Sequence, residues 1–182
     1  MKTFFYYPLL AVLAGGMLGG CQSINPDAVH AYYYVLDSEA YAIDRATPVY
    51  HIDRRVFQLV RETGCRERPE KRSYHEGDLD GDRAEDPVML AMCDMGMSYH
   101  QFMFISLSSR PKHVMMKEVG GKGFQSVETV EIVNSTVVIQ GKKYAPDDAM
   151  CCPSLPFQAT YAIQDNAIIE LSTKELQPTA KD

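Results

Sequence analysis

The segment PVMLAMCDMGMSYHQFMFISLS, from Pro87 to Ser108, decides the fold class of this chain. It contains two nearly continuous apolar runs, Pro87 to Met95 and Tyr99 to Ser108, which are joined near Gly96. Apolar runs of this length are typical of strands that are buried on both faces or that lie centrally in a sheet. The segment therefore predicts two neighbouring strands within a buried sheet.

Five further segments have the apolar pattern of strands, and short polar breaks separate two pairs of them, as hairpin turns require. These strands are His113 to Val119, Val127 to Val133, Thr136 to Lys143, Phe157 to Gln164 and Ala167 to Ser172, with breaks at Asn134-Ser135 and Asp165-Asn166. Apolar residues at helical spacing predict one helix from Val49 to Glu62. The charged segment Arg66 to Arg72 predicts a solvated loop, and His75-Glu76 an exposed turn. The expected fold is α+β, mainly an antiparallel β-sheet with one main helix packed on it.

The chain has 182 residues and a formal net charge of -6. We expect a signal peptide over residues 1–20, a tether and the start of the domain over 21–47, a single globular domain over 48–174 and a tail over 175–182. The negative charge is unsuited to nucleic-acid binding. No internal repeat of about 20 to 50 residues is visible, which argues against a solenoid.

The N-terminal sequence has the pattern of a secretory signal. Lys2 precedes an apolar run from Phe4 to Leu18, which leads into Gly19-Gly20-Cys21. This pattern resembles the lipobox of bacterial lipoproteins. The resemblance implies that Cys21 becomes the first mature residue and carries a diacylglyceryl group and an N-acyl chain such as palmitate. Gln22 favours the outer membrane, because the best-known inner-membrane retention signal resembles an aspartate at that position.

Two alternatives to lipidation are an uncleaved membrane helix and a signal that is cut without lipidation. The apolar run is about 15 residues long, whereas a membrane span needs roughly 20, so its length argues against the first.

Besides Cys21, the chain has four cysteines, an even number that suits two disulfides in an oxidising compartment: Cys65, Cys93, Cys151 and Cys152. A Cys151–Cys152 bond closes a strained ring between adjacent residues. We therefore expect each of these two cysteines to bond with Cys65 or Cys93, with the order of pairing left open.

The acidic sequence DLDGDRAED, from Asp78 to Asp86, precedes the first central strand. Its candidate calcium ligands are at relative positions 1, 3, 5 and 9: Asp78, Asp80, Asp82 and Asp86. The sequence is similar to the aspartate loops of FG-GAP and integrin-type repeats, but Arg83 replaces the glycine at position 6, where a positive φ angle is often required. The alternative is a metal-free turn in which the aspartates accept hydrogen bonds from backbone amides and Arg83 pairs with a carboxylate.

Together with the lipobox and the aspartate loop, the sequence YAPDDAMCCPS from Tyr144 to Ser154 is similar in outline to small lipoproteins of the LppP/LprE type. The resemblance covers about residues 70 to 172. It implies a small envelope lipoprotein without known catalytic residues.

No strong catalytic signature is present. The histidines His51, His75, His100 and His113 do not follow a zinc spacing, and no serine lies in a Gly-x-Ser-x-Gly elbow. We expect a non-enzymatic envelope lipoprotein that presents its sheet to an envelope protein or a glycan. The alternative is a periplasmic hydrolase or enzyme inhibitor, which a cleft containing His100, His113 and an acidic partner would favour.

Overall fold

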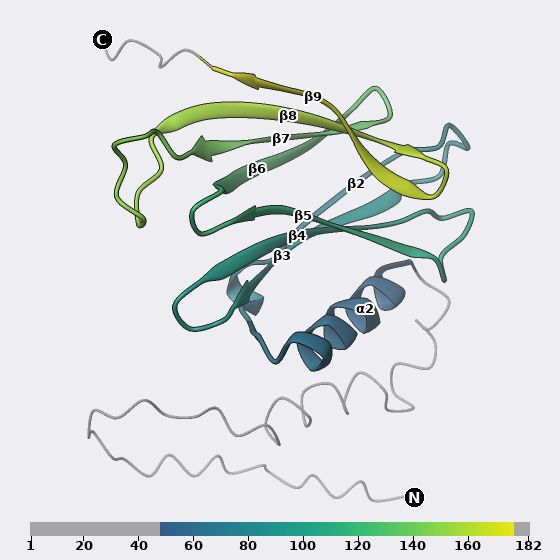
Figure 1. Cartoon of the computed structure of the whole chain (residues 1–182). Coiled ribbons are helices and arrows are strands. Elements are labelled where there is room, and N and C mark those ends of the chain that lie inside the picture. Colours follow the sequence, from purple (N-terminus) through teal and green to yellow (C-terminus); the bar gives the residue numbers. More distant parts are fainter. Residues whose placement is uncertain (1–47, 177–182) are drawn as a thin grey trace, which may run out of the picture.

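A computed structural model describes residues 48–176, which form a sheet with one long helix packed on it (Figure 1). The expected signal peptide and tether, and most of the expected tail, lie outside the described residues. In chain order the elements are α2 (Pro48–Thr63), β1 (Arg66–Glu67), a 3-10 turn (Pro69–Lys71), β2 (Ser73–Gly77), β3 (Asp86–Asp94), β4 (Tyr99–Ser106), β5 (Val114–Gly121), β6 (Gln125–Val133), β7 (Thr136–Lys143), β8 (Leu155–Gln164) and β9 (Ala167–Glu175).

The strands pair antiparallel in the order β1-β3-β4-β5-β6-β7-β8-β9, and β2 also pairs with β3. Between β5 and β6 the only registered pair is Gly121↔Gln125. The sheet opens at this point and folds over, so that β2 contacts β6 and β5 contacts β9. The result is two packed halves, β1–β5 and β6–β9, with α2 on the outer face of the first half (Figure 1). The expected mainly antiparallel sheet with one packed helix is confirmed.

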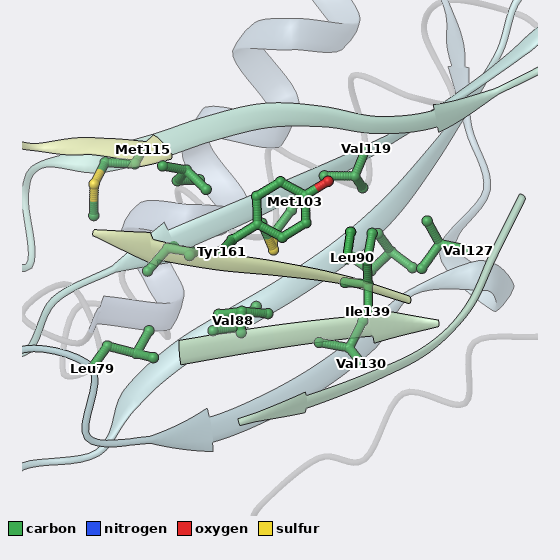
Figure 2. Packing of buried hydrophobic residues seen from close by; sticks show 14 of the residues in the cluster. Leu79, Val88, Leu90, Met103, Met115, Val119, Val127, Val130, Ile139 and Tyr161 are labelled. Carbon is green, nitrogen blue, oxygen red and sulfur yellow. The ribbon is translucent and has the colours of Figure 1, made fainter. Parts of the chain in front are cut away.

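The apolar run that begins at Pro87 lies in β3 and contributes to two hydrophobic cores, because successive side chains point to opposite faces of a strand. Val88 and Leu90 point into the core between the two halves, where Tyr161 and Met103 also lie (Figure 2). Met89 belongs instead to the core beneath α2, with Ala91, Cys93, Phe104 and the helical residues Ile52, Val56 and Leu59. Burial on both faces explains why polar residues are nearly excluded from this strand.

The local signals at the helix and at two hairpins agree with the structure. Pro48 begins α2, where its missing amide hydrogen costs no helical bond, and Gly64 ends it with a φ of 69° and an amide that donates to the Val60 carbonyl. Both central residues of each predicted hairpin turn have positive φ, as type I′ turns require: Asn134, Ser135, Asp165 and Asn166.

Two local predictions were wrong. The segment from Arg66 to Arg72 contains β1, which pairs with β3, and a 3-10 turn. Its last residue, Arg72, forms ion pairs with two carboxylates. Its Nη1 donates to Asp53 Oδ1 at 2.8 Å, and its Nε donates to Glu67 Oε1 at 2.6 Å. His75 lies in β2 opposite Val88 and not in a turn.

The burial of His75 predicts a pH dependence of stability. Burial lowers the pKa of His75, and its Nε2 has no hydrogen-bond partner. The unfolded chain therefore binds more protons than the folded protein below about pH 6.5, so stability falls as the pH falls through that value. We expect the melting temperature to fall between pH 7.5 and 6, and His75→Gln to reduce the slope. Equal slopes in both proteins would contradict this expectation.

Candidate functional site

The predicted aspartate loop connects β2 to β3 and is closed by the pair Gly77↔Asp86. Asp86 is the first residue of β3 and is fully buried. Its Oδ2 accepts a hydrogen bond from the Leu79 amide at 2.8 Å, and its Oδ1 accepts one from the Ser108 amide at 2.7 Å. The buried carboxylate thus connects the aspartate loop to the loop between β4 and β5.

Asp78 shapes the tip of the loop. Its two oxygens accept hydrogen bonds from the amides of Gly81 at 2.6 Å and Arg83 at 3.0 Å. Arg83 has a φ of 71°, so position 6 has the positive φ that such loops often require, although the residue is not glycine. The aspartates therefore cap backbone amides, as the metal-free alternative supposes. Within residues 48–176, however, the Arg83 side chain forms no ion pair.

Three of the four candidate calcium ligands come together. Asp78, Asp80 and Asp86 each offer a carboxylate oxygen, and these oxygens lie within 4.8 Å of one another. Asp82 is not part of this group, and its Oδ1 accepts a hydrogen bond from the Ala84 amide at 2.7 Å. A carboxylate oxygen that accepts one hydrogen bond keeps a second lone pair, so the three clustered aspartates retain the capacity to bind a hard cation.

Sequence reasoning missed the serines that complete this region. Ser109 Oγ donates to Asp80 Oδ2 at 2.7 Å, and the Ser108 amide is a partner of Asp86. Both serines follow β4, more than twenty residues from the aspartates that they contact. No motif marks them, because only the pairing of β3 with β4 brings the two loops together.

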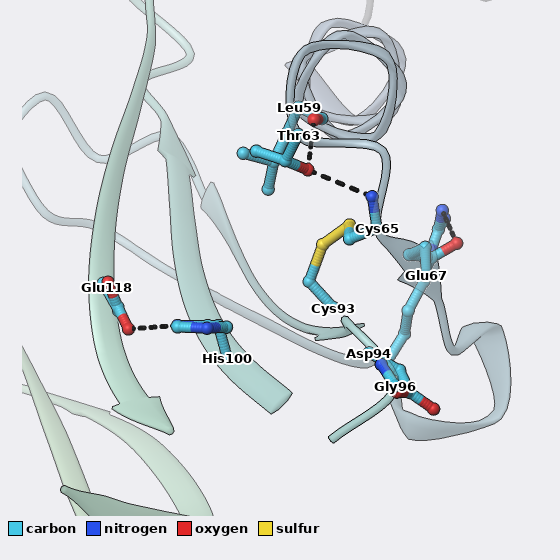
Figure 3. The surroundings of a disulfide bond; sticks show 10 residues. Leu59, Thr63, Cys65, Glu67, Cys93, Asp94, Gly96, His100 and Glu118 are labelled. Atoms are coloured by element: carbon cyan, nitrogen blue, oxygen red, sulfur yellow. Dashed lines mark hydrogen bonds and ion pairs between the residues drawn. A yellow bond between two sulfur atoms is a disulfide. The ribbon is translucent and has the colours of Figure 1, made fainter. Parts of the chain in front are cut away.

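The four cysteines form two disulfides, but the expected pairing was wrong. Cys65 is bonded to Cys93, with their Cα atoms 5.6 Å apart (Figure 3). Cys151 is bonded to Cys152. The cause is β1, whose residue Glu67 pairs with Cys93 and which brings Cys65 beside the end of β3. Cys151 and Cys152 lie instead in the loop between β7 and β8, in the other half of the sheet.

The histidine cluster that would favour a hydrolase does not form among residues 48–176. His100 Nδ1 lies 2.7 Å from Glu118 Oε1 (Figure 3). His113 directly precedes β5, whose first residue, Val114, pairs with Ser106 at the far end of β4. The two histidines therefore lie at opposite ends of the β4–β5 pair.

Comparison with known proteins identifies no relative: no family model, no curated protein and no solved structure matches the chain. Within residues 48–176, no helix has the length and apolar character needed to cross a membrane.

Proposed function

We propose that the chain is a lipid-anchored lipoprotein of the bacterial cell envelope, with a non-enzymatic domain that binds an envelope protein or a glycan. The observation that carries the proposal is the sequence from Lys2 to Cys21, which combines a basic start, an apolar run and a lipobox-like Leu18-Gly19-Gly20-Cys21. The disulfide pairing of all four other cysteines supports an oxidising compartment such as the periplasm.

The anchor supplies the membrane attachment in this proposal. Each buried methylene of an acyl chain contributes about 0.8 kcal/mol, so several chains hold a protein stably where one chain gives only marginal binding. Gln22 supports the outer membrane as the destination, with the domain on its periplasmic face.

The outward face of β6–β9 supports the binding role. Gln140 pairs with Gln158 and Val138 with Thr160, and these side chains point away from the buried Ile139 and Ala159. No described element covers this face (Figure 1). A partly exposed sheet with polar side chains suits contact with a protein or with sugar hydroxyl groups.

Membrane fractionation tests the anchor. In a diderm bacterial host we expect the wild-type chain in the outer-membrane fraction with incorporated labelled palmitate. Cys21→Ser should lose the label and leave that fraction, whereas Gln22→Asp should keep the label and move to the inner membrane. Labelling of Cys21→Ser at the wild-type level would contradict the proposal.

We also propose that Asp78, Asp80 and Asp86 hold a structural calcium ion. Their clustered oxygens support this site, and the ion would offset the repulsion of three carboxylates at the start of β3. A bound ion stabilises the folded state by about 2.7 kcal/mol at a concentration of 100 times its dissociation constant.

Calcium should therefore raise the melting temperature, and Asp80→Ala should abolish this increase. Asp80 is exposed, so its replacement leaves the core intact. The matched control is Asp82→Ala, which removes the same charge from the same loop but lies outside the cluster, and it should keep the calcium effect. Identical melting curves of the wild type with calcium and with chelator would reject the site.

A further inference from the structure

The face of α2 that points away from the core is rich in basic residues. His51, Arg54, Arg55 and Gln58 follow the helical spacing i, i+3, i+4 and i+7, so their side chains share one face. The opposite face is buried against β3 and β4. These four residues do not belong to the core that α2 forms with β3 and β4.

The exposed face of α2 forms one wall of a groove of about 780 Å³. Lys112, His113 and Val114 form the other wall, at the start of β5. We call this the basic groove; its basic lining residues are His51, Arg54, Arg55, Arg61, Lys112 and His113. Its volume lies within the range of about 300 to 1,000 Å³ that is usual for ligand sites.

The positive charge of the basic groove is largely uncompensated. Among the described residues of the lining, Glu62 is the only acidic one, and it lies 3.5 Å from Arg55. Within the described part of the chain, neither Arg54 nor Arg61 nor Lys112 forms an ion pair. This charge excess contrasts with the net charge of -6 of the whole chain.

Aromatic rings hold two of the guanidinium groups in place. The Arg54 guanidinium carbon lies 6.0 Å from the centroid of the Tyr50 ring, and that of Arg61 lies 5.7 Å from the centroid of the Phe57 ring. Cation–π contacts of this kind position a guanidinium group without neutralising it. Both groups therefore remain able to attract an anion.

Two buried nitrogen atoms of residues in the lining have no hydrogen-bond partner. Arg55 Nη1 and His51 Nε2 are inaccessible to solvent and make no hydrogen bond within the described structure, although Arg55 Nη1 lies 3.5 Å from Glu62 Oε2. Burial, and then the charges of Lys112 and Arg54, lower the pKa of His51, which is the direction expected in a positive field. A ligand with several acceptor oxygens would supply hydrogen-bond acceptors to these groups and would neutralise the excess positive charge of the groove.

We propose that the basic groove binds a phosphate-type anion, carried by a lipid headgroup or by a free phosphorylated molecule. Phosphate oxygens match the fork of a guanidinium group, and the helix supplies three such groups. Phe57 and Val114 lie in the same lining and would contact an apolar part of the ligand. Phosphate binding in the basic groove does not depend on the lipid anchor proposed above.

Thermal melting of the full chain in neutral detergent tests the site, with inorganic pyrophosphate as the free probe. Mixed micelles that contain phosphatidylglycerol or phosphatidylcholine form the lipid arm. We expect a saturable rise in melting temperature, which Arg54→Gln/Lys112→Gln weakens by about tenfold or more in apparent affinity. The control is Lys142→Gln, an exposed cation on β7 that pairs with Glu128, and it should leave the affinity unchanged.

The two arms distinguish the sources of the phosphate. A response to pyrophosphate supports a free phosphorylated ligand, and a response to phosphatidylglycerol alone supports a lipid headgroup. Arg54 and Lys112 are exposed, so the ligand-free melting temperature of the double variant should match that of the wild type. The absence of a saturable response to either probe would overturn the proposal, as would equal losses in the double variant and in Lys142→Gln.

Discussion

Replacement of both Cys65 and Cys93 by alanine is expected to lower the free energy of unfolding by roughly 3.5 kcal/mol. The bond between these residues spans 28 positions, and closing a loop of this length removes much conformational entropy from the unfolded chain. Both cysteines are also buried beneath α2, so the bond fastens the end of the helix to β3. Urea unfolding at neutral pH, followed by circular dichroism, measures the change.

The matched control is the Cys151→Ala/Cys152→Ala variant. It also removes one disulfide, but this bond closes a ring between adjacent residues, so the same entropy argument gives a loss of only about 1 kcal/mol. Both cysteines of this pair are exposed, and their replacement leaves the core unchanged. Equal losses in the two double variants would contradict the observed pairing.

Gly141→Ala is expected to destabilise the protein by about 3 kcal/mol or more. A Cβ atom at Gly141 would clash with the Ser126 carbonyl oxygen and would lie 3.0 Å from the Val127 Cα. Both atoms belong to the backbone of β6, which pairs with β7 and is irregular between Val127 and Thr129. The clash can be relieved only if β6 moves away from β7, at a cost in hydrogen bonds and in packing between the two halves of the sheet.

Gly64→Ala provides the comparison for this variant. Gly64 has a φ of 69°, but a Cβ atom there would have no neighbour within 4 Å. The expected cost is that of the left-handed backbone alone, about 1 kcal/mol. Equal urea midpoints for Gly141→Ala and Gly64→Ala would contradict the close approach of the β6 backbone to Gly141.

The strands and the helix could be predicted because their signals are local. The apolar run of β3 indicates a strand that is buried on both faces. The spacing of Ile52, Val56 and Leu59 indicates a helix with one buried face. The turn at Asn134-Ser135 requires positive φ, which asparagine adopts more readily than most residues. Each of these features depends on neighbours within a few residues.

The disulfide pairing and the sets of residues that form the aspartate cluster and the basic groove depend on contacts between residues that are far apart in the sequence. β1 is only two residues long and lies in a charged segment, so no pattern predicts that it brings Cys65 to Cys93. The separation of Asp82 from the other aspartates depends on how the loop turns after Gly81. The basic groove combines His51 with Lys112, which only the packing of α2 against β5 brings together.

Intact mass spectrometry of the chain extracted from bacterial membranes tests the central claim most directly. The account predicts a mature protein that begins at Cys21 and carries the mass of a diacylglyceryl group and one N-acyl chain, with the four other cysteines oxidised. An unmodified Cys21, or a leader still joined to it, would contradict the account.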